Sequence, residues 1–170
     1  FMMKDRAGAL WIGTTDGLSR FKEGAFTNFT TRESLSNGYV RAIYEDRDGA
    51  LWIGTYGGGL NRLKDGRITQ ITTKHGLHDD FVSRILADGD DQFWMLGNRG
   101  VFRVSRQQLN DFIDGRNKTI FCVVHDAADG MTPSEGNGGN QPAGWQMQDG
   151  RLWFPTIEGV AIVDPALNNT

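Results

Sequence analysis

Short runs of alternating hydrophobic and polar residues fill one stretch of the chain, residues 39–74. Glycine- and aspartate-containing turns separate these runs, and alternation with a period of two between such turns predicts antiparallel hairpins. Four strands in about 40 residues are typical of one blade of a β-propeller. The four predicted strands are residues 40–44 (VRAIY), 51–55 (LWIGT), 60–63 (LNRL) and 67–72 (RITQIT).

This unit repeats along the chain. Residues 5–14 (DRAGALWIGT) recur as residues 46–55 (DRDGALWIGT), identical at nine of ten positions. A degenerate third copy covers residues 90–95, and a fourth, residues 149–154, follows after an insertion. A fixed period of this length marks a repeat architecture in which neighbouring units stack to bury their apolar faces. We therefore predict an all-β fold, a partial β-propeller of about four four-stranded antiparallel blades, over residues 1–170 as a single propeller fragment.

One tryptophan recurs in each unit, in the second predicted strand. A residue repeated in every unit serves the unit, so these side chains are expected to pack between blades rather than to stack on a ligand. Trp145 lies outside this register, so it is the one tryptophan for which we consider stacking on a ligand; packing in the core is the alternative. The repeated tryptophans are Trp11, Trp52, Trp94 and Trp153.

The insertion before the last unit spans residues 105–141. Ser105 followed three residues later by Gln108 fits a capping box, and residues 109–113 have apolar side chains at helical spacing, so a short rim helix is predicted. Residues 119–124 (TIFCVV) are expected to form the outer strand, with Cys122 inside it. Cys122 is interpreted as a small packed residue, with a reactive thiol as the alternative.

Composition and charge exclude several classes of protein. The formal net charge is -3, and the 18 Lys and Arg residues are scattered singly, which argues against a nucleic-acid groove. The single cysteine excludes an internal disulfide and a multi-cysteine zinc site. No apolar run approaches the roughly 18 residues of a membrane helix, so no membrane contact by this segment is expected. The 23 glycines fit many tight turns.

The repeat resembles the two-component regulator propeller repeats found in periplasmic sensor regions of bacterial signalling receptors. Residues 43–62 carry the pattern of that family almost in full: an apolar strand, an aspartate turn, Leu-Trp-Ile-Gly-Thr, a glycine-rich turn and Gly-Leu. Residues 2–20 carry it as well. Residues 135–139 (EGNGG), 141–143 (QPA) and 150–156 (GRLWFPT) are similar to the last blades of these sensors.

The resemblance implies an extracytoplasmic, periplasmic sensor segment of a transmembrane receptor with a histidine kinase or diguanylate cyclase output domain elsewhere in the full protein. Complete sensor regions of this family hold many more blades. We therefore expect this chain to be a section of a larger propeller. Because an open array exposes its end faces, we expect either a homo-oligomer or completion by further blades of the full-length chain.

Ligand-binding candidates come from the innermost strands and from the glycine-rich loop of the insertion. Polar residues of innermost strands would face the axis or rim, and loop amides with Asn, Gln and Glu side chains could read hydroxyl groups of a small molecule or oligosaccharide. A structural loop whose glycines supply positive φ is the alternative for the loop. The candidates are Tyr39, Arg41, Arg84, Glu135, Asn137, Asn140, Gln141 and Trp145.

Motifs of catalysis are not apparent, and no cofactor, metal or catalytic residue is predicted. The cluster His75, His78, Asp79 and Asp80 is interpreted as a solvated turn between blades. The preferred hypothesis is a ligand-sensing module without enzymatic activity. A propeller lyase or glycosidase with a converging histidine or carboxylate pair, and a protein-binding scaffold, are the alternatives.

Overall fold

Four antiparallel sheets form the protein in a computed structural model that describes residues 1–125, 129 and 135–167. The first sheet holds β1 (Met2–Lys4), β2 (Leu10–Gly13), β3 (Leu18–Lys22) and β4 (Ala25–Phe29). The second holds β5 (Val40–Glu45), β6 (Leu51–Thr55), β7 (Leu60–Lys64) and β8 (Arg67–Ile71). The third holds β9 (Arg84–Ala87), β10 (Gln92–Gly97), β11 (Gly100–Ser105) and β12 (Val123–His125). The fourth shows β13 (Trp145–Gln146), β14 (Leu152–Pro155) and β15 (Val160–Val163).

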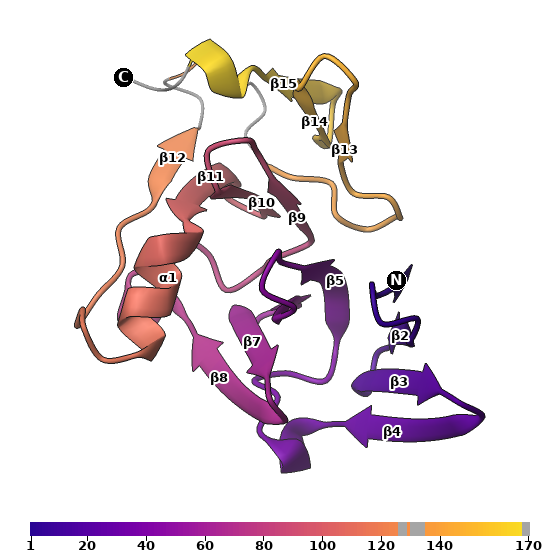
Figure 1. Ribbon diagram of the computed structural model, residues 1–170. Coiled ribbons are helices and arrows are strands. Elements are labelled where there is room, and N and C mark those ends of the chain that lie inside the picture. The colour runs from indigo at the N-terminus through magenta and orange to yellow at the C-terminus, as the bar shows by residue number, and fades with distance from the viewer. Residues whose placement is uncertain (126–128, 130–134, 168–170) are drawn as a thin grey trace.

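In every sheet the strands are hydrogen-bonded in chain order, which is the up-and-down meander of a propeller blade. Figure 1 shows β5 and β9 toward the middle of the molecule, while β4, β8 and β12 lie at its periphery. The fold prediction, an all-β propeller of stacked blades, is confirmed. The remaining elements are the helix α1 (Arg106–Ile113) and the short 3-10 helices η1 (Thr31–Glu33), η2 (Thr73–His75) and η4 (Pro165–Leu167).

Three apolar cores lie between successive sheets, and a tryptophan stands in each. Trp11 packs against Val40 and Ile43 of the second sheet, and its side chain is 5% exposed. Trp52 packs against the third sheet and Trp94 against the fourth, and both are fully buried. The predicted packing between blades is thus confirmed for these three tryptophans.

Trp153 departs from that prediction, because it is only half-buried. It lies on the outer face of the last sheet, on the side where the described residues provide no further sheet. Its cross-strand neighbours on this face, Trp145 and Ile162, are 59% and 49% exposed. Leu152 and Phe154, the residues on either side of Trp153 in β14, face the opposite way and are buried against the third sheet.

The opposite end of the stack exposes a second apolar face. Phe26 and Met2 of the first sheet are 62% and 68% exposed. Phe26 occupies the cross-strand position that Ile68 has in the second sheet, since each lies opposite the residue that follows the arginine of the third strand. Ile68 packs into the core between the first two sheets. Both ends of the stack therefore show faces that the inner sheets bury against one another.

The insertion forms the predicted helix and differs in its strand. The Ser105 hydroxyl accepts a hydrogen bond from the Gln108 amide at 3.1 Å, which confirms the N-cap. The Gln108 side chain accepts from the Phe121 amide instead of closing a capping box. The predicted outer strand at residues 119–124 is wrong in position: β12 begins at Val123, and Cys122 precedes it. The reason is that Ile120 donates its amide to the His75 carbonyl oxygen and is buried under the loop of the second sheet.

None of the helices in the described part of the chain is long and apolar enough to cross a membrane.

Candidate functional site

One rim of the molecule gathers the points at which the inner strands begin. We call it the pocket rim, because a hollow of about 210 Å³ opens there. The opposite, hairpin rim carries the aspartate turns between the first and second strands of the sheets. The pocket rim brings together the beginning of β1, the segments before β5 and β13, and the loop after β2. The hollow is lined by Phe1, Gly13, Thr14, Thr15, Tyr39, Val40, Arg41 and Gln141.

Arg41 owes its position to an irregularity in β5. Val40 is paired with Thr55 and Ala42 with Gly54, so Arg41 has no partner residue on β6 and stands in a β-bulge. A bulge bends the strand and re-aims the side chain at the extra position. Arg41 donates from Nη1 to the Tyr39 hydroxyl at 2.9 Å, and its Cζ lies 5.1 Å from the centre of the Tyr39 ring. The pair thus forms one wall of the hollow.

Gln141 reaches the same wall from a segment 100 residues away. Its Nε2 donates to the Arg41 carbonyl oxygen at 3.0 Å. Figure 1 shows the corresponding loop before β13 extending toward the N-terminus. Tyr39, Arg41 and Gln141, which the sequence placed in two different units, therefore meet in a single site.

Arg84, at the start of β9, approaches this site from the third sheet. Its Cζ lies 5.6 Å from the centre of the Phe1 ring, which itself lines the hollow. The side chain is half-buried, and burial lowers the pKa of its guanidinium. Its stem lies against Gly144, where an added Cβ would come within 3.0 Å of Arg84 Cγ. Residue 144 also has a φ of 149°, so glycine is required there on both counts.

The other loop candidates lie apart from the hollow. Asn137 donates its amide to the Pro155 carbonyl oxygen, and Glu135 accepts from the Ile157 amide, so this segment runs along the end of β14. The side chains of Glu135, Asn137 and Asn140 are exposed, and none of the three lines the hollow. The first residues of the predicted loop, 132–134, lie outside the described residues.

Trp145 is not packed in the core, the alternative to ligand stacking that the sequence offered, because it is 59% exposed. It stands opposite Trp153 on the exposed face of the last sheet, away from the core. This is the cross-strand position that Tyr44 has opposite Trp52 and Leu86 opposite Trp94. Trp145 therefore belongs to the repeat after all, at the inner-strand position that faces the repeated tryptophan. Its contact with a ligand stays a prediction.

A row of aromatic rings continues the site along the pocket rim. Tyr39 and Tyr56 have ring centres 5.3 Å apart, and Tyr56 meets Phe81 edge-on at 4.6 Å. Half of the Tyr56 side chain is exposed, so the row presents aromatic surface to solvent. Tyr56 and Phe1 were missed as site residues from the sequence. The signal for Tyr56 was its place between the repeated LWIGT strand and a run of three glycines.

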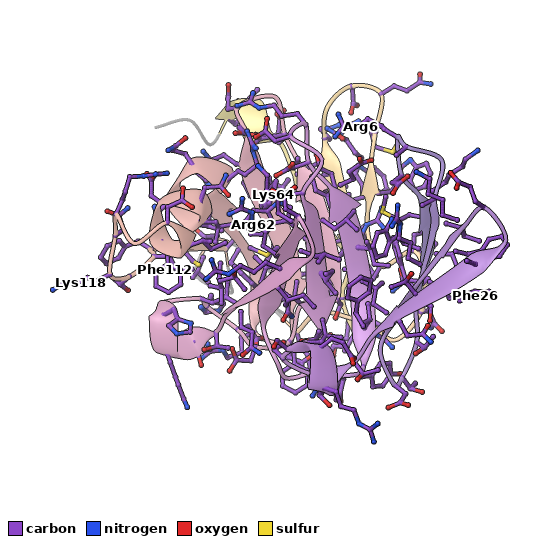
Figure 2. All side chains as sticks on the ribbon, turned by 60° about the horizontal axis from the view of Figure 1, so that its bottom comes forward. Arg6, Phe26, Arg62, Lys64, Phe112 and Lys118 are labelled. Atoms are coloured by element: carbon purple, nitrogen blue, oxygen red, sulfur yellow. The ribbon has the colours of Figure 1, made fainter. Side chains whose placement is uncertain are left out.

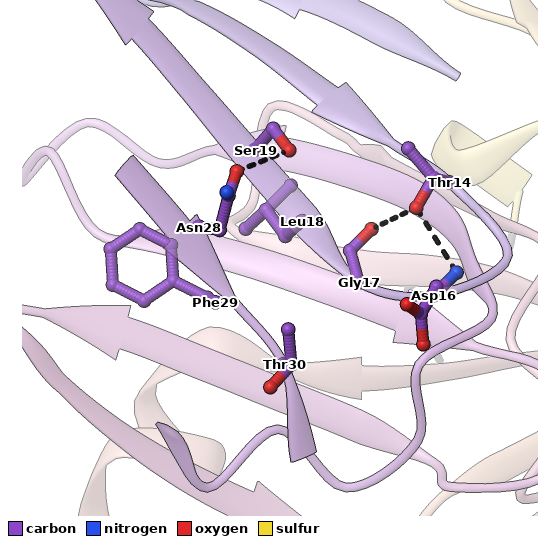
Figure 3. Close-up of a pocket in the computed structure, with 8 residues that line it drawn as sticks. All are labelled: Thr14, Asp16, Gly17, Leu18, Ser19, Asn28, Phe29 and Thr30. Carbon is purple, nitrogen blue, oxygen red and sulfur yellow. Dashed lines mark hydrogen bonds between the residues drawn. The ribbon is translucent and has the colours of Figure 1, made fainter. Parts of the chain in front are cut away.

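A second hollow, of about 200 Å³, lies at the edge of the first sheet (Figure 3). Some of its polar groups bond to one another. The Thr14 hydroxyl donates to the Gly17 carbonyl oxygen at 3.0 Å, and Ser19 donates to the Asn28 side-chain oxygen at 2.7 Å.

His75, Asp79 and Asp80 of the predicted solvated turn hold the backbone of the connecting loop, and Asp79 is buried rather than solvated, at 5% exposed. His75 Nδ1 accepts from the Thr72 amide at 3.0 Å, Asp79 accepts from the amides of Phe81 and Arg99, and Asp80 accepts from Thr73. Among the described residues, no group of three or more His, Cys, Asp or Glu side chains is arranged to hold a metal ion. The lining of the hollow at the pocket rim contains arginine, tyrosine, threonine and glutamine side chains as its polar groups.

Comparison with known proteins supports the fold and the repeat. The chain superimposes on the extracellular domain of the putative hybrid two-component system BT4673 from B. thetaiotaomicron with a TM-score of 0.79 and 20% identity, covering 98% of this chain and 23% of that one. The extracellular domain of BT3049 from the same organism gives a TM-score of 0.59 and 18% identity, covering 99% and 28%. Virginiamycin B lyase from Staphylococcus aureus, in its catalytically inactive H270A form with quinupristin, gives a TM-score of 0.60 and 16% identity, covering 96% and 54%.

At these identities the likeness shows a shared fold, and the chain spans about a quarter of the length of the two extracellular domains. None of the curated proteins matches the chain in sequence. The family model described as two component regulator propeller matches residues 34–57, which cover β5 and β6 with the loops around them. Residues 34–57 are thus a two-component regulator propeller repeat, as their sequence pattern indicated, within a chain that has the β-propeller fold throughout its described sheets.

Proposed function

We propose that this chain is part of the extracytoplasmic, periplasmic propeller of a bacterial two-component receptor and that it contributes to binding of a small-molecule or oligosaccharide ligand. The observation that carries the proposal is the match of 98% of the chain to the extracellular domain of a hybrid two-component system, together with the family repeat at residues 34–57. A propeller of this kind transmits a change in ligand occupancy to an output domain elsewhere in the receptor.

The ligand site in this proposal is the pocket rim around Tyr39, Arg41 and Gln141. Aromatic rings and convergent polar groups beside a hollow are the usual chemistry of small-molecule recognition. The lyase alternative needs a histidine or carboxylate pair pointing into the site. The lining residues offer arginine and tyrosine there instead, so sensing is the function that this geometry favours.

Calorimetric titration of the purified protein with a panel of neutral and charged oligosaccharides and small metabolites tests the site. Tyr39→Ala should weaken binding of any ligand found, because it removes both an aromatic surface and the hydrogen-bond partner of Arg41. Phe26→Ala is the matched control, since Phe26 is an exposed aromatic residue at the periphery of the first sheet (Figure 2) and does not line the hollow. No binding by any member of the panel to the folded protein would contradict the proposal.

The location can be tested in the parent protein. An alkaline phosphatase fusion placed after residue 125, where β12 ends, should be active, since that enzyme matures outside the cytoplasm. An inactive fusion beside an active cytoplasmic reporter at the same position would place the propeller inside the cell.

We further propose that a sheet of the same kind covers the exposed outer face of the last sheet. Trp11, Trp52 and Trp94 each pack on a following sheet, so the same contact continued at Trp153 requires a fifth one. Further blades of a longer chain would supply it, and a second copy of this chain would take its place in the isolated protein.

A further inference from the structure

Two arginines at the pocket rim lack a carboxylate partner among the described residues. Arg41 and Arg84 come from the inner strands of adjacent sheets. Arg41 lines the hollow together with Phe1, and Arg84 Cζ lies 5.6 Å from the centre of the Phe1 ring. Both side chains are half-buried. Neither takes part in an ion pair within the described residues, and the Nε atom of each is buried without an acceptor there.

Arg106, a buried arginine with a structural role, differs from Arg41 and Arg84 in having carboxylate partners. Arg106 is 5% exposed and contacts the carboxylates of Asp46, Asp48 and Asp91. Hydrogen bonding to Asp91 raises the pKa of Arg106, whereas burial alone acts on Arg84 and lowers its pKa. A guanidinium withdrawn from water without a counter-charge is unfavourable. Among the described residues, Arg41 and Arg84 therefore lack the negatively charged partner that Arg106 has in its three carboxylates.

A second basic region differs in having carboxylates in its lining. The groove of about 530 Å³ between β7, β8 and α1 is lined by Arg62 and Lys64, both labelled in Figure 2, and by Arg67, but Asp65 and Asp114 share its walls. Carboxylates of the protein are thus already present in that groove. In the hollow at the pocket rim the lining residues carry no acidic side chain.

The neighbouring aromatic row defines what else the ligand must carry. Tyr39, Tyr56 and Phe81 offer ring surface beside the arginines, and such surface packs against the apolar face of a flat or saturated ring. The hollow of about 210 Å³ is smaller than the roughly 300–1,000 Å³ of sites that enclose a whole small molecule, so it would admit one unit of a longer ligand.

We propose that Arg41 and Arg84 together bind the carboxylate of an acidic sugar unit, so that the ligand of this propeller is a uronate-bearing saccharide rather than a neutral one. This inference rests on the sensing function proposed above and specifies its ligand class. Arginine suits the task because its planar guanidinium can donate two parallel hydrogen bonds to a carboxylate.

The test is calorimetric titration with disaccharides ending in glucuronate, galacturonate or mannuronate, each paired with its methyl ester. The ester keeps the shape of the sugar and removes its charge. A disaccharide ending in galactose 6-sulfate distinguishes a carboxylate site from a general anion site. At least one acid should bind at least tenfold more tightly than its ester, and its affinity should fall as salt concentration rises.

Variants assign the effect to the two arginines. Arg41→Gln and Arg84→Gln should each weaken binding of the acid by roughly 10- to 100-fold, the range for one charge-assisted hydrogen bond, and should leave the ester little changed. If Arg84→Gln melts at a much lower temperature than the parent, Arg84→Lys, which keeps the charge but loses the planar fork, should show an intermediate loss.

Arg20→Gln and Arg62→Gln are the matched controls. Each replaces a half-buried arginine that stacks on a tryptophan and has an Nε atom without a partner among the described residues. The two arginines of the site likewise stack on an aromatic ring and have such an Nε atom. Arg20 and Arg62 differ in position, because they lie on β3 and β7. Neither should change the affinity for the acid. A loss confined to Arg62→Gln would place the anion in the groove beside α1 and overturn the assignment.

The outcomes separate this inference from the function on which it rests. Binding of neutral saccharides, with esters as tight as acids or acids silent, would overturn the acidic ligand and leave the sensing function standing. Tighter binding of the sulfated sugar than of every uronate would overturn the carboxylate assignment. No binding by any neutral or acidic compound would overturn both.

Discussion

A carboxylate six residues before each of the first three repeated tryptophans holds the hairpin turn and the indole together. Asp46 Oδ1 accepts from the amides of Asp48 and Ala50, and its Oδ2 accepts from Trp52 Nε1 at 2.9 Å. Asp5 and Asp88 make the same contact with the indoles of Trp11 and Trp94. This one side chain satisfies the turn and a buried donor at once, which explains why the repeat contains an aspartate there.

The fourth unit lacks this carboxylate, because Met147 stands six residues before Trp153. The backbone turn is nevertheless the same: Met147 donates to the Arg151 carbonyl oxygen and accepts from the Gly150 amide, as Asp46 does with Ala50 and Gly49. The Trp153 Nε1 atom is buried and has no hydrogen-bond partner among the described residues.

Met147→Asp should therefore stabilise the protein by about 1 kcal/mol, the net value of one hydrogen bond. Urea unfolding measures the gain. In a Trp153→Phe background the same substitution should give no gain, since the donor has been removed. An equal gain in both backgrounds would show that the new carboxylate acts on something other than the indole.

Cys122 offers a second prediction at this scale. Burial raises the pKa of its thiol to about 11, so about one thiol in a thousand is ionised at pH 8 in the folded protein. An unfolded thiol has a pKa of about 8.5 and ionises far more at that pH. Because folding raises this pKa, the free energy of unfolding falls as pH rises from about 8.5, where the unfolded thiol ionises, towards about 11, where the folded thiol ionises.

Iodoacetamide labelling followed by mass spectrometry at pH 8 should thus be slow in the native protein and fast in urea, and the native rate should increase about tenfold per pH unit up to pH 10. Equal native and unfolded rates at pH 8 would contradict the burial of this thiol.

At the scale of elements, arginines connect the hairpin rims of successive sheets. Arg6 of the first sheet donates to the Asp46 and Arg47 carbonyl oxygens of the second, and Arg47 pairs with Asp91 of the third at 3.2 Å. Arg106, the first residue of α1, extends this series from the helix. It ties α1 to the turn of the second sheet through Asp46 and to the third sheet through Asp91.

Arg106→Met should cost about 3–5 kcal/mol, because it leaves the carboxylate of Asp46, which is 1% exposed, without its counter-charge. Arg116→Met is the control: Arg116 also pairs with two carboxylates, Asp111 and Asp114, but its side chain is 56% exposed, and exposed pairs contribute little. The two variants are compared by urea midpoint. Similar midpoints would mean that Arg106 is not a structural tie.

At the scale of the molecule, the stack is open at both ends. Trp145, Trp153, Val160 and Ile162 lie on one outer face, where Trp145 and Val160 are more than half exposed. Inner sheets bury the equivalent face completely at Trp52 and Trp94. A contiguous exposed apolar face of this kind favours association.

The isolated protein should therefore self-associate, with a sedimentation coefficient that rises with concentration. Ile162→Lys should reduce the association, because it places a charge in the centre of the face. Phe121→Lys is the matched control, as Phe121 is 73% exposed but lies outside the terminal sheets. A wild-type protein that sediments as a monomer at every concentration would refute the docking face.

Much of the fold was predictable because it depends on interactions between residues that are close in the chain. The alternation of residues 40–44 and 51–55, the aspartate turns and the period of about 41 residues placed the strands of the second sheet and the stacking of Trp52. Register errors arose where a distant contact outweighed a local preference. Residues 119–122 have strand-like composition, yet Ile120 is drawn to His75 across 45 positions and the strand starts later.

The candidate site was predictable only in part. Tyr39, Arg41 and Arg84 were chosen as candidates because inner strands face the axis of a propeller, and Gln141 because its loop is rich in glycine and amides. The structure brings Tyr39, Arg41 and Gln141 to one hollow. The contribution of Tyr56 and Phe1 depends on contacts between residues far apart in the chain. Tyr56 meets Tyr39 and Phe81, and Phe1 meets Arg84, which no local pattern encodes.

The sequence by itself determined the blade, its repeat and the packing role of its tryptophans, since period, turn chemistry and apolar alternation act between residues that are near in the chain. Only the tertiary structure decided which side chains meet at the pocket rim and which charges lack a partner there. The physical reason is that Arg41 and Arg84 lie in adjacent sheets, on β5 and β9, and Gln141 lies in the loop before β13. Their approach and the absence of an acidic lining depend on how whole sheets stack and on the bulge at Arg41.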